Sequence, residues 1–527
     1  MKISTLTAFL FTLIVPCTGL LAQQPCINQV SDIAAGSVSS LPLELTSFSS
    51  ELYFSATDNI NGTELWNYDG SSLTMVSDIR PGSLSSLPNH LAVAGIYLYF
   101  SANDGSNGTE LYKFDGSTVS LAADINPGVN HSYPDVLTPL ASGLYFTADD
   151  GVHGTELWFY GGTTAVLAAD VATGSASSNI TEIVVVGSDL YFTADDGVNG
   201  KELWFYDGGT ASLAADIAPG SASSNPTELT VVGTKVYFRA DDGTNGNELW
   251  MYDGSTATLI DINPGSGNGN PTAFAVQGSD LYFAGFDVTS GYELRKYTGT
   301  TLSLAADINP GSGNAFNSPI TVSGSDLYFK ATNGTNGFEL WKFDGSTATM
   351  LSDINSGSAD SNPDFITAVG TDIYFAADDG INGTEIWYYD GTDVTLGEDI
   401  NSGATGSMPT ELTAVGTDLY FAADDGVTGD ELWYSICTTI SGLADPDKDF
   451  RESVSVYPNP VVDVLTISQR QNGHIQIRIM DNLGSIVATG ETNEQSTTID
   501  LSSAAKGVYF VLISNDETSF VEKVVKQ

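Results

Sequence analysis

The acidic residues of one recurring turn are the first candidates for chemistry. Residues 190–208 read LYFTADDGVNGKELWFYDG, and the turn within them carries Asp195, Asp196, Asn199 and Glu202. Carboxylate and amide oxygens are the ligands that Ca²⁺ prefers in proteins. The spacing covers only part of an EF-hand pattern, since Gly197 stands at a ligand position and the loop is too short. Asp, Gly and Asn are also what a tight turn requires. We therefore favour a structural turn, with a weak calcium site as the alternative.

The ninefold recurrence of this turn argues against catalysis by its acids. The Glu recurs from Glu64 to Glu431, with a Gly two residues before each copy. One asymmetric active site does not need nine equal copies of the same residue, so these residues are more simply explained as structural. We expect each Glu to accept backbone N–H bonds and each Gly to supply a positive φ. Paired acids are too frequent to indicate a glycosidase, and nucleophile-elbow, HExxH and phosphate-loop motifs are absent from the sequence. Site-specific chemistry should use residues that break the repeat: His90, His131, Tyr133, His153, Arg239, Arg295 and Lys330.

The composition restricts the classes of partner. The chain has 527 residues with 65 Asp and Glu against 17 Lys and Arg, a formal charge of −48. Such a surface repels phosphate backbones and anionic lipids, so we expect neither nucleic acid nor a membrane surface as a partner. Hydrophobic residues make up 41%, enough for packed cores.

The first 22 residues predict export. They contain Lys2, an apolar run from Leu6 to Val15 and small residues up to Ala22, as in a secretory signal peptide. The run is too short for a stable membrane span. A lipoprotein signal at Cys17 is disfavoured by Pro16 before it. We expect a mature protein that is not an integral membrane protein.

A repeat of 46 residues, once 45, organises residues 23–437. LYF-like triplets begin nine times, from Leu52 to Leu419. In residues 227–262 the unit reads as four short strands, TELTVVG, VYFRA, ELWMY and TATLIDI, with Thr234 and Lys235 connecting the first two. A Pro, Gly and Ser-rich crossover follows. This pattern predicts a β-propeller of nine four-stranded blades. A smaller ring with displaced repeats and two packed partial arrays are the alternatives.

The ends of the repeat region predict a closed ring. The region begins with a fourth strand, residues 27–33, and ends with a third strand, residues 431–437, so the two ends complete one blade together. Once the signal peptide is removed, Cys26 and Cys437 are the remaining cysteines. In the repeat frame both fall at the tip of the same hairpin, which predicts a disulfide between them. Two unrelated thiols are the alternative.

A different module follows. Residues 438–452 read as a polar linker, and residues 453–527 as a β-sandwich of seven strands. Its segments YPNP, MDNLG, GVYFVLI and VEKVVK resemble the type IX secretion C-terminal sorting domain of Bacteroidota. The resemblance implies export through the periplasm and across the outer membrane by the type IX machinery, leaving the protein secreted or at the cell surface. Its motif residues here are Tyr457, Pro458, Asn459, Pro460, Gly507 and Tyr509.

The repeat itself resembles the ELWxxDGT repeat family of bacterial exported proteins, on segments such as TELWNYDGS at 63–71 and TEIWYYDGT at 384–392. It is loosely similar to TolB-like blades. Neither resemblance implies a catalytic residue or a cofactor. A rigid disc with variable loops suits recognition, so we expect a binding or adhesion module for glycan, protein or matrix. An extracellular polysaccharide- or peptide-degrading enzyme and a purely structural surface-layer component are the alternatives.

Overall fold

The structure, a computed structural model, describes residues 26–140, 143–316, 318–436, 454–457, 461–469, 473–480, 486–502, 504–515 and 519–526. The regular elements in these ranges are all β-strands. A helix with the length and hydropathy of a membrane span is not found among the described residues.

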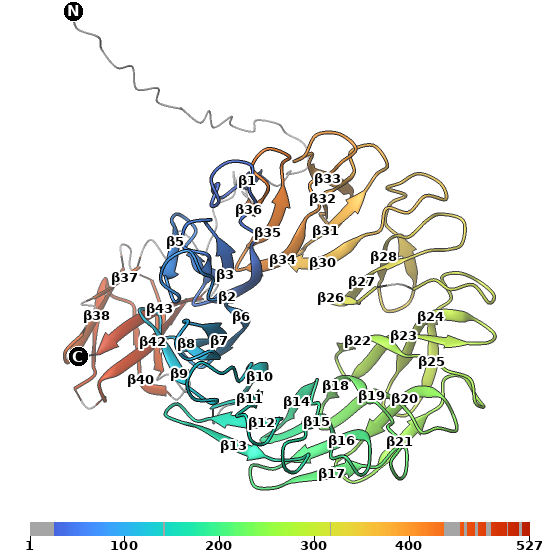
Figure 1. The fold of residues 1–527 in the computed structure, drawn as a ribbon. Helices are drawn as coiled ribbons and strands as arrows, with labels where there is room; N and C mark the ends of the chain where they lie inside the picture. Colours follow the sequence, from blue (N-terminus) through green and yellow to red (C-terminus); the bar gives the residue numbers. More distant parts are fainter. Residues whose placement is uncertain are drawn as a thin grey trace, which may run out of the picture.

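Nine four-stranded antiparallel sheets of the described chain follow one another around a ring (Figure 1). We number them as blades 1 to 9. Blades 1 to 3 contain β2 (Leu43–Phe48), β3 (Glu51–Thr57), β4 (Thr63–Tyr68), β5 (Leu73–Ser77); β6 (Asn89–Ala94), β7 (Tyr97–Asn103), β8 (Thr109–Phe114), β9 (Val119–Ala123); β10 (Asp135–Leu140), β11 (Gly143–Asp149), β12 (Thr155–Tyr160), β13 (Ala165–Ala169). Blades 4 to 6 contain β14 (Ile183–Val186), β15 (Asp189–Asp195), β16 (Lys201–Tyr206), β17 (Ala211–Ala215); β18 (Thr227–Val232), β19 (Lys235–Asp241), β20 (Asn247–Tyr252), β21 (Ala257–Ile260); β22 (Thr272–Gln277), β23 (Asp280–Asp287), β24 (Gly291–Tyr297), β25 (Leu302–Ala306). Blades 7 to 9 contain β26 (Thr321–Ser323), β27 (Asp326–Ala331), β28 (Glu339–Phe343), β29 (Ala348–Met350); β30 (Asp364–Val369), β31 (Asp372–Asp378), β32 (Thr384–Tyr389), β33 (Val394–Glu398); β34 (Thr410–Val415), β35 (Asp418–Asp424), β36 (Asp430–Ile436) and β1 (Cys26–Gln29).

The strand order within a blade follows the chain, as the repeat predicted. In blade 4 Leu190 pairs with Tyr206 and Asp195 with Lys201, so residues 190–208 do form the central hairpin. One connection differs from the prediction. Val232 pairs with Lys235, so Gly233 and Thr234 form the turn between β18 and β19, one residue earlier than expected. Gly233 has a φ of +65°, which explains why a glycine occupies the first turn position.

Both faces of each blade are buried, which accounts for the repeated Tyr-Phe pair. In blade 4, Tyr191 contacts Tyr252 of blade 5 with ring centroids 5.6 Å apart. Phe192 points to the opposite face and packs with Leu157 of blade 3 in one core cluster. Such aromatic contacts contribute about 0.5–1.5 kcal/mol beyond area burial. Neighbouring side chains on a strand point to opposite faces, so consecutive aromatics bind a blade to both neighbours.

The ring is closed by the two ends of the repeat region, as predicted. Strand β1 pairs antiparallel with β36, with Gln29 opposite Trp433. Across the junction, Tyr68 of blade 1 lies 5.9 Å from Tyr420 of blade 9, between ring centroids. The prediction of nine blades is confirmed, and a smaller ring and two partial arrays are wrong. Pairing β1 with β36 removes an exposed sheet edge.

The predicted disulfide depends on one residue that lies outside the described residues, Cys437. Cys26 begins β1 and pairs with Ile436, the last described residue of β36. The bridge stays a prediction. In the exported protein we expect no titratable thiol without reductant, whereas two titratable thiols would contradict the bridge. Reduction should lower the stability by at most about 6 kcal/mol, the chain-entropy value for so long a loop.

The C-terminal module consists of two antiparallel sheets. The described residues place β37 (Val454–Tyr457), β38 (Val464–Gln469) and β41 (Ser496–Asp500) in one, and β39 (Ile475–Met480), β40 (Ile486–Thr492), β42 (Gly507–Ser514) and β43 (Ser519–Lys526) in the other. Residues of both sheets, such as Leu465 and Ile477, share one buried core. This agrees with the predicted sandwich.

Candidate functional site

The acids of the repeated turn bind the turn itself. In blade 4, Asp196 Oδ1 accepts the backbone N–H groups of Val198 and Asn199 at 2.9 and 2.7 Å, and Asp196 Oδ2 accepts the Asn199 amide. Asp195 Oδ1 accepts the Gly197 N–H at 2.8 Å. Burial opposes ionisation of Asp196, but these hydrogen bonds lower the pKa of its carboxyl below the ordinary value. These contacts are those of an Asx-type turn.

The fourth calcium candidate points elsewhere. Glu202 is fully buried and accepts the N–H groups of Ile217 and Ser224 at 2.9 and 2.8 Å, together with the Ser224 hydroxyl. Both donors lie in the crossover to blade 5, so the carboxylate fixes that crossover and not the turn. Among the described residues, no group of three or more His, Cys, Asp and Glu side chains could hold a metal ion. Calcium binding by these hairpins stays a prediction.

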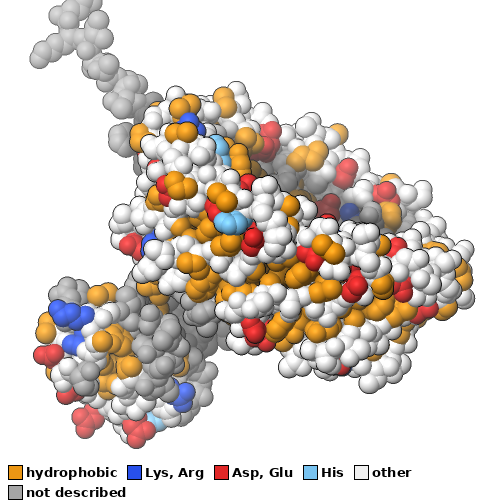
Figure 2. All heavy atoms as spheres, turned by 60° about the horizontal axis from the view of Figure 1, so that its bottom comes forward, with side chains coloured by type: hydrophobic (Ala, Val, Ile, Leu, Met, Phe, Trp, Pro, Cys, Tyr) orange, Lys and Arg blue, Asp and Glu red, His pale blue; other side chains and the backbone are white. Residues whose placement is uncertain are grey.

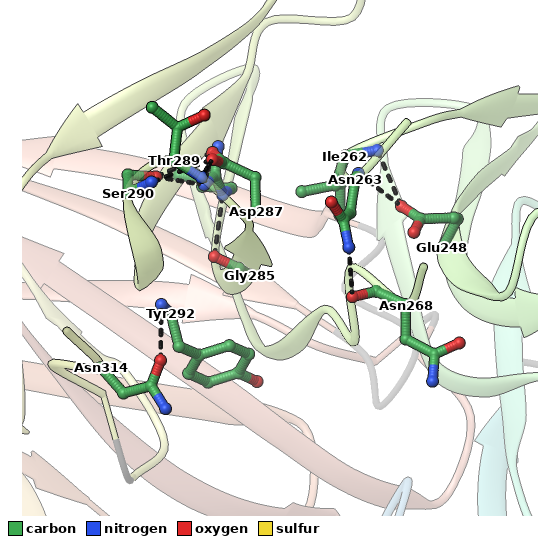
Figure 3. Close-up of polar contacts among 11 residues, drawn as sticks. Glu248, Ile262, Asn263, Asn268, Gly285, Asp287, Thr289, Ser290, Tyr292 and Asn314 are labelled. Carbon is green, nitrogen blue, oxygen red and sulfur yellow. Dashed lines mark hydrogen bonds and ion pairs between the residues drawn. The ribbon is translucent and has the colours of Figure 1, made fainter. Parts of the chain in front are cut away.

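The buried glutamates recur in all nine blades and have raised pKa values. Burial raises the pKa of Glu110, Glu248 and Glu293 to about 7, although hydrogen bonds to their carboxylates oppose the shift. Figure 3 shows Glu248 accepting the N–H groups of Ile262 and Asn263.

These shifts predict a pH dependence of stability. Between the ordinary pKa of 4.5 and about 7, the folded chain keeps protons that the unfolded chain releases. Stability is therefore lost as the pH rises through this window. At pH values below this window, the protein loses stability as the turn aspartates, whose pKa values are lowered, become protonated. We expect the melting temperature to be highest near pH 4.5 and to fall by about 5 °C towards pH 8. A melting temperature that rises from pH 5 to pH 8 would contradict this.

The departures of blade 6 from the repeat have a structural explanation. Arg295 replaces the usual Trp, and its Nε–H donates to the Gly285 carbonyl at 2.8 Å, as the Trp66 indole N–H donates to the Ala56 carbonyl in blade 1. The guanidinium also contacts Asp287 and Ser290, the region shown in Figure 3. Despite burial, hydrogen bonds from Ser290, Thr289 and Arg295 lower the pKa of Asp287. Arg295 is thus a packing residue.

Three further residues that break the repeat lie apart from one another. Lys330 is buried and pairs with Asp364 at 3.4 Å between blades 7 and 8. His153 caps the turn of blade 3 through Asp150, with Nδ1 2.8 Å from Oδ2, and this hydrogen bond raises the pKa of the imidazole. Arg239 lies on β19 of blade 5, half-buried. The structure does not bring these residues together.

Other repeat-breaking residues do converge, in a hollow of about 530 Å³ between blades 2 and 3. His90 on β6 lies with its Nδ1 3.3 Å from Asp135 Oδ1 on β10. His131 and Tyr133 come from the crossover that enters blade 3. Sequence reasoning singled out the two histidines and the tyrosine, but missed the other polar residues of the lining: Arg80, Ser85, Ser86, Asn89, Ser101, Asn103, Thr109 and Asp135. Arg80 could have been found, because five later repeats have Asn at its position.

The contacts of His131 in this hollow define the tautomer of its neutral ring. The Thr109 backbone N–H donates to His131 Nδ1 at 2.9 Å, so Nδ1 must be an acceptor and the neutral ring carries its proton on Nε2. The corresponding N–H in blade 1, that of Thr63, donates to the hydroxyl of Ser85 instead. His131 therefore keeps a structural bond of the repeat and adds an N–H donor. Within the described part of the chain, no residue accepts a hydrogen bond from Nε2.

Tyr133 holds an exposed ring in a strained backbone conformation. Its φ is +48°, and its side chain is 63% exposed. The ring stacks on His131, with centroids 5.0 Å apart and planes 12° apart. The corresponding residues of four other blades are asparagines with positive φ, which tolerate this region better: Asn179, Asn225, Asn270 and Asn362.

Four consecutive blades carry an exposed apolar residue at the repeat position of Tyr133. Blades 9, 1, 2 and 3 are consecutive in the ring and place Met408, Leu41, Leu87 and Tyr133 there, each more than half exposed and with positive φ. A non-Gly residue held in this region costs about 1–3 kcal/mol, and such strain clusters at functional sites. The space-filling view shows propeller histidines at the surface beside acidic and hydrophobic side chains (Figure 2).

The predicted sorting residues are only partly described. Tyr457 ends β37 about half-exposed. Pro458, Asn459 and Pro460 lie outside the described residues. Gly507 begins β42, and Tyr509 is buried, with its hydroxyl donating to the Ala505 carbonyl at 2.8 Å.

A family comparison identifies the C-terminal module. Residues 455–527 match the model of the secretion system C-terminal sorting domain. This confirms the type IX sorting resemblance and indicates an exported protein, at the cell surface or secreted, that the type IX machinery handles. The resemblance of the repeat to the ELWxxDGT family stays a prediction. No curated protein matches the sequence.

Solved structures resemble the chain in architecture. PorZ, an essential bacterial surface component of the type-IX secretion system of Porphyromonas gingivalis, is 12% identical over 92% of this chain and 86% of its own, with a TM-score of 0.29. The GH74 enzyme of Niastella koreensis is 13% identical over 80% and 76%, with a TM-score of 0.27. A puromycin hydrolase is 12% identical over 65% of this chain and 59% of its own, with a TM-score of 0.35. TM-scores this low do not bear on function.

Proposed function

We propose, from the premise that residues 455–527 are a sorting domain, that this exported protein acts outside the cell as a binding module. Its ligand contacts the hollow between blades 2 and 3. One observation carries the proposal: residues that break the repeat in neighbouring blades meet at one exposed place, with an aromatic ring held there at a cost in backbone strain. The other repeat-breaking residues have contacts that explain them structurally or lie alone.

The route of export is part of the proposal. The N-terminal signal takes the chain to the periplasm, and the sorting domain takes it across the outer membrane. Deleting residues 455–527 in the native host should leave the protein in the periplasm. Its appearance in the medium or at the surface without that segment would contradict the route.

The binding role is tested with variants that restore the residues of other blades. Asparagine replaces Tyr133 as in blade 4, and serine replaces His131, because Ser177 accepts the equivalent N–H in blade 3 at 2.9 Å. The full exported chain and its Tyr133→Asn/His131→Ser variant are applied to arrays of glycans, peptides and matrix proteins. We expect a ligand that the variant loses. Absence of any ligand, or equal binding by the variant, would contradict the proposal, and turnover of a probe would favour an enzyme.

A further inference from the structure

We infer that the hollow between blades 2 and 3 binds an uncharged saccharide, with one sugar ring stacked on Tyr133. The inference rests on the proposed function and names its ligand class. The chemistry of such a ligand is an apolar C–H face combined with hydroxyl groups that both donate and accept hydrogen bonds. The hollow offers a partner for each of these features.

The stacking surface is Tyr133. The His131 ring supports one face of the tyrosine ring at 5.0 Å, while the side chain remains 63% exposed. The electron-rich face of an aromatic ring attracts the slightly positive C–H groups that line one face of a pyranose. An aromatic ring that is already immobilised loses little conformational entropy when a ligand packs on it.

Polar groups around this ring match sugar hydroxyls. His131 presents Nε2–H as a donor, because its Nδ1 accepts the Thr109 N–H. The Asp135 carboxylate, half-exposed beside His90, supplies an acceptor. Asn89 accepts the His90 N–H through Oδ1, which directs its NH₂ group to other acceptors. A hydroxyl that donates to Asp135 can accept from one of these N–H groups at the same time.

Electrostatics disfavour an anionic saccharide. The chain carries a formal charge of −48, and a polyanionic glycan would approach against that field. Within the hollow, the positive charge of Arg80 is accompanied by the negative charge of Asp135. The cavity volume of about 530 Å³ lies in the range of small-molecule sites, and its open side leaves room for a chain to extend.

A matched control lies on the other side of the ring. Phe365 in blade 8 is also an exposed aromatic with positive φ, 53°, and is 48% exposed. It lies at the repeat position that Val136 occupies in blade 3, so Phe365→Val restores a residue that the fold accepts with positive φ. Tyr133→Asn and Phe365→Val each remove one exposed ring, but only the first changes the hollow.

The experiment is titration calorimetry of the full exported chain with cellohexaose, laminarihexaose, xylohexaose and mannohexaose, with polygalacturonate as the anionic comparison. We expect at least one neutral hexasaccharide to bind the wild type and Phe365→Val equally. Tyr133→Asn should weaken this binding by about tenfold, as loss of one aromatic stacking contact implies. His131→Ser should also weaken it, because the variant loses the Nε2–H donor and the ring that supports Tyr133, while the serine hydroxyl can still accept the Thr109 N–H. Tyr133→Asn should not lower the melting temperature, because asparagine tolerates this positive φ better than tyrosine.

Three results would overturn the inference: no binding of any neutral hexasaccharide, a preference for polygalacturonate, or unchanged binding by Tyr133→Asn. These failures are distinguishable from failure of the proposed function. If a peptide or protein from the arrays binds in a Tyr133-dependent manner while all four hexasaccharides fail, the binding role stands and the saccharide does not. If every array ligand also fails, both are wrong.

Discussion

Gly200→Ala should destabilise the propeller by more than about 4 kcal/mol, a size reserved for severe backbone or core damage. Gly200 has a φ of +71°, and a Cβ at this position would lie 2.2 Å from the backbone oxygen of Ala222. Neither group can move without shifting the crossover that Glu202 holds. The repeated Gly is therefore required for close approach of two backbones as well as for its dihedral angle.

Gly208→Ala is the matched control. Gly208 lies in the same blade with a φ of +92°, and nothing lies within 4 Å of the Cβ that alanine would add. This variant should lower the free energy of unfolding by about 1–2 kcal/mol, the cost of holding alanine in the left-handed conformation. Calorimetric melting of both variants measures the difference. Equal falls in melting temperature would show that the close contact with Ala222 contributes nothing.

Glu202→Ala should destabilise the protein by about 3–5 kcal/mol, the cost of removing one partner from a buried charged network. The substitution leaves the N–H groups of Ile217 and Ser224 without their buried acceptor and opens a cavity. Glu202→Gln should fall between alanine and wild type, because the amide keeps the volume but turns an NH₂ group towards N–H donors.

Asp207→Ala controls for the loss of a carboxylate. Asp207 lies at an exposed turn of the same blade and also accepts two N–H groups, from Gly209 and Thr210 at 2.9 and 3.2 Å. Water replaces that acceptor, so we expect a much smaller loss of stability than for Glu202→Ala. Urea unfolding monitored by tryptophan fluorescence compares the variants. An effect of Glu202→Ala no larger than that of Asp207→Ala would contradict the structural role of the buried Glu.

Much of the fold was predictable because the chain repeats itself. The positions of the Tyr-Phe pairs indicated nine blades, and the strand fragments at residues 27–33 and 431–437 indicated closure. The nine four-stranded sheets of the propeller confirm the first prediction, and the pairing of β1 with β36 confirms the second. The repeated Glu was correctly expected to accept backbone N–H bonds. The location of its donors was not predictable, because they lie in a crossover 15 to 22 residues further along the chain.

The candidate site was predictable only in part. Comparison of the repeats singled out His90, His131 and Tyr133, together with residues that proved unrelated. Arg295 replaces the Trp N–H with its own Nε–H, and that substitution is visible only when the Gly285 carbonyl is seen beside it.

The sequence by itself determined the repeat, the closure of the ring and the sorting domain, because these depend on local strand patterning and on the matching of copies. The tertiary structure alone decided which residues of different repeats lie next to one another. Asp135 belongs to one blade and His90 to the next, and the curvature of the ring brings these side chains within 3.3 Å. The support of Tyr133 by His131 likewise depends on a Thr109 N–H from the neighbouring blade. Contacts between blades are set by ring geometry, which no single repeat encodes.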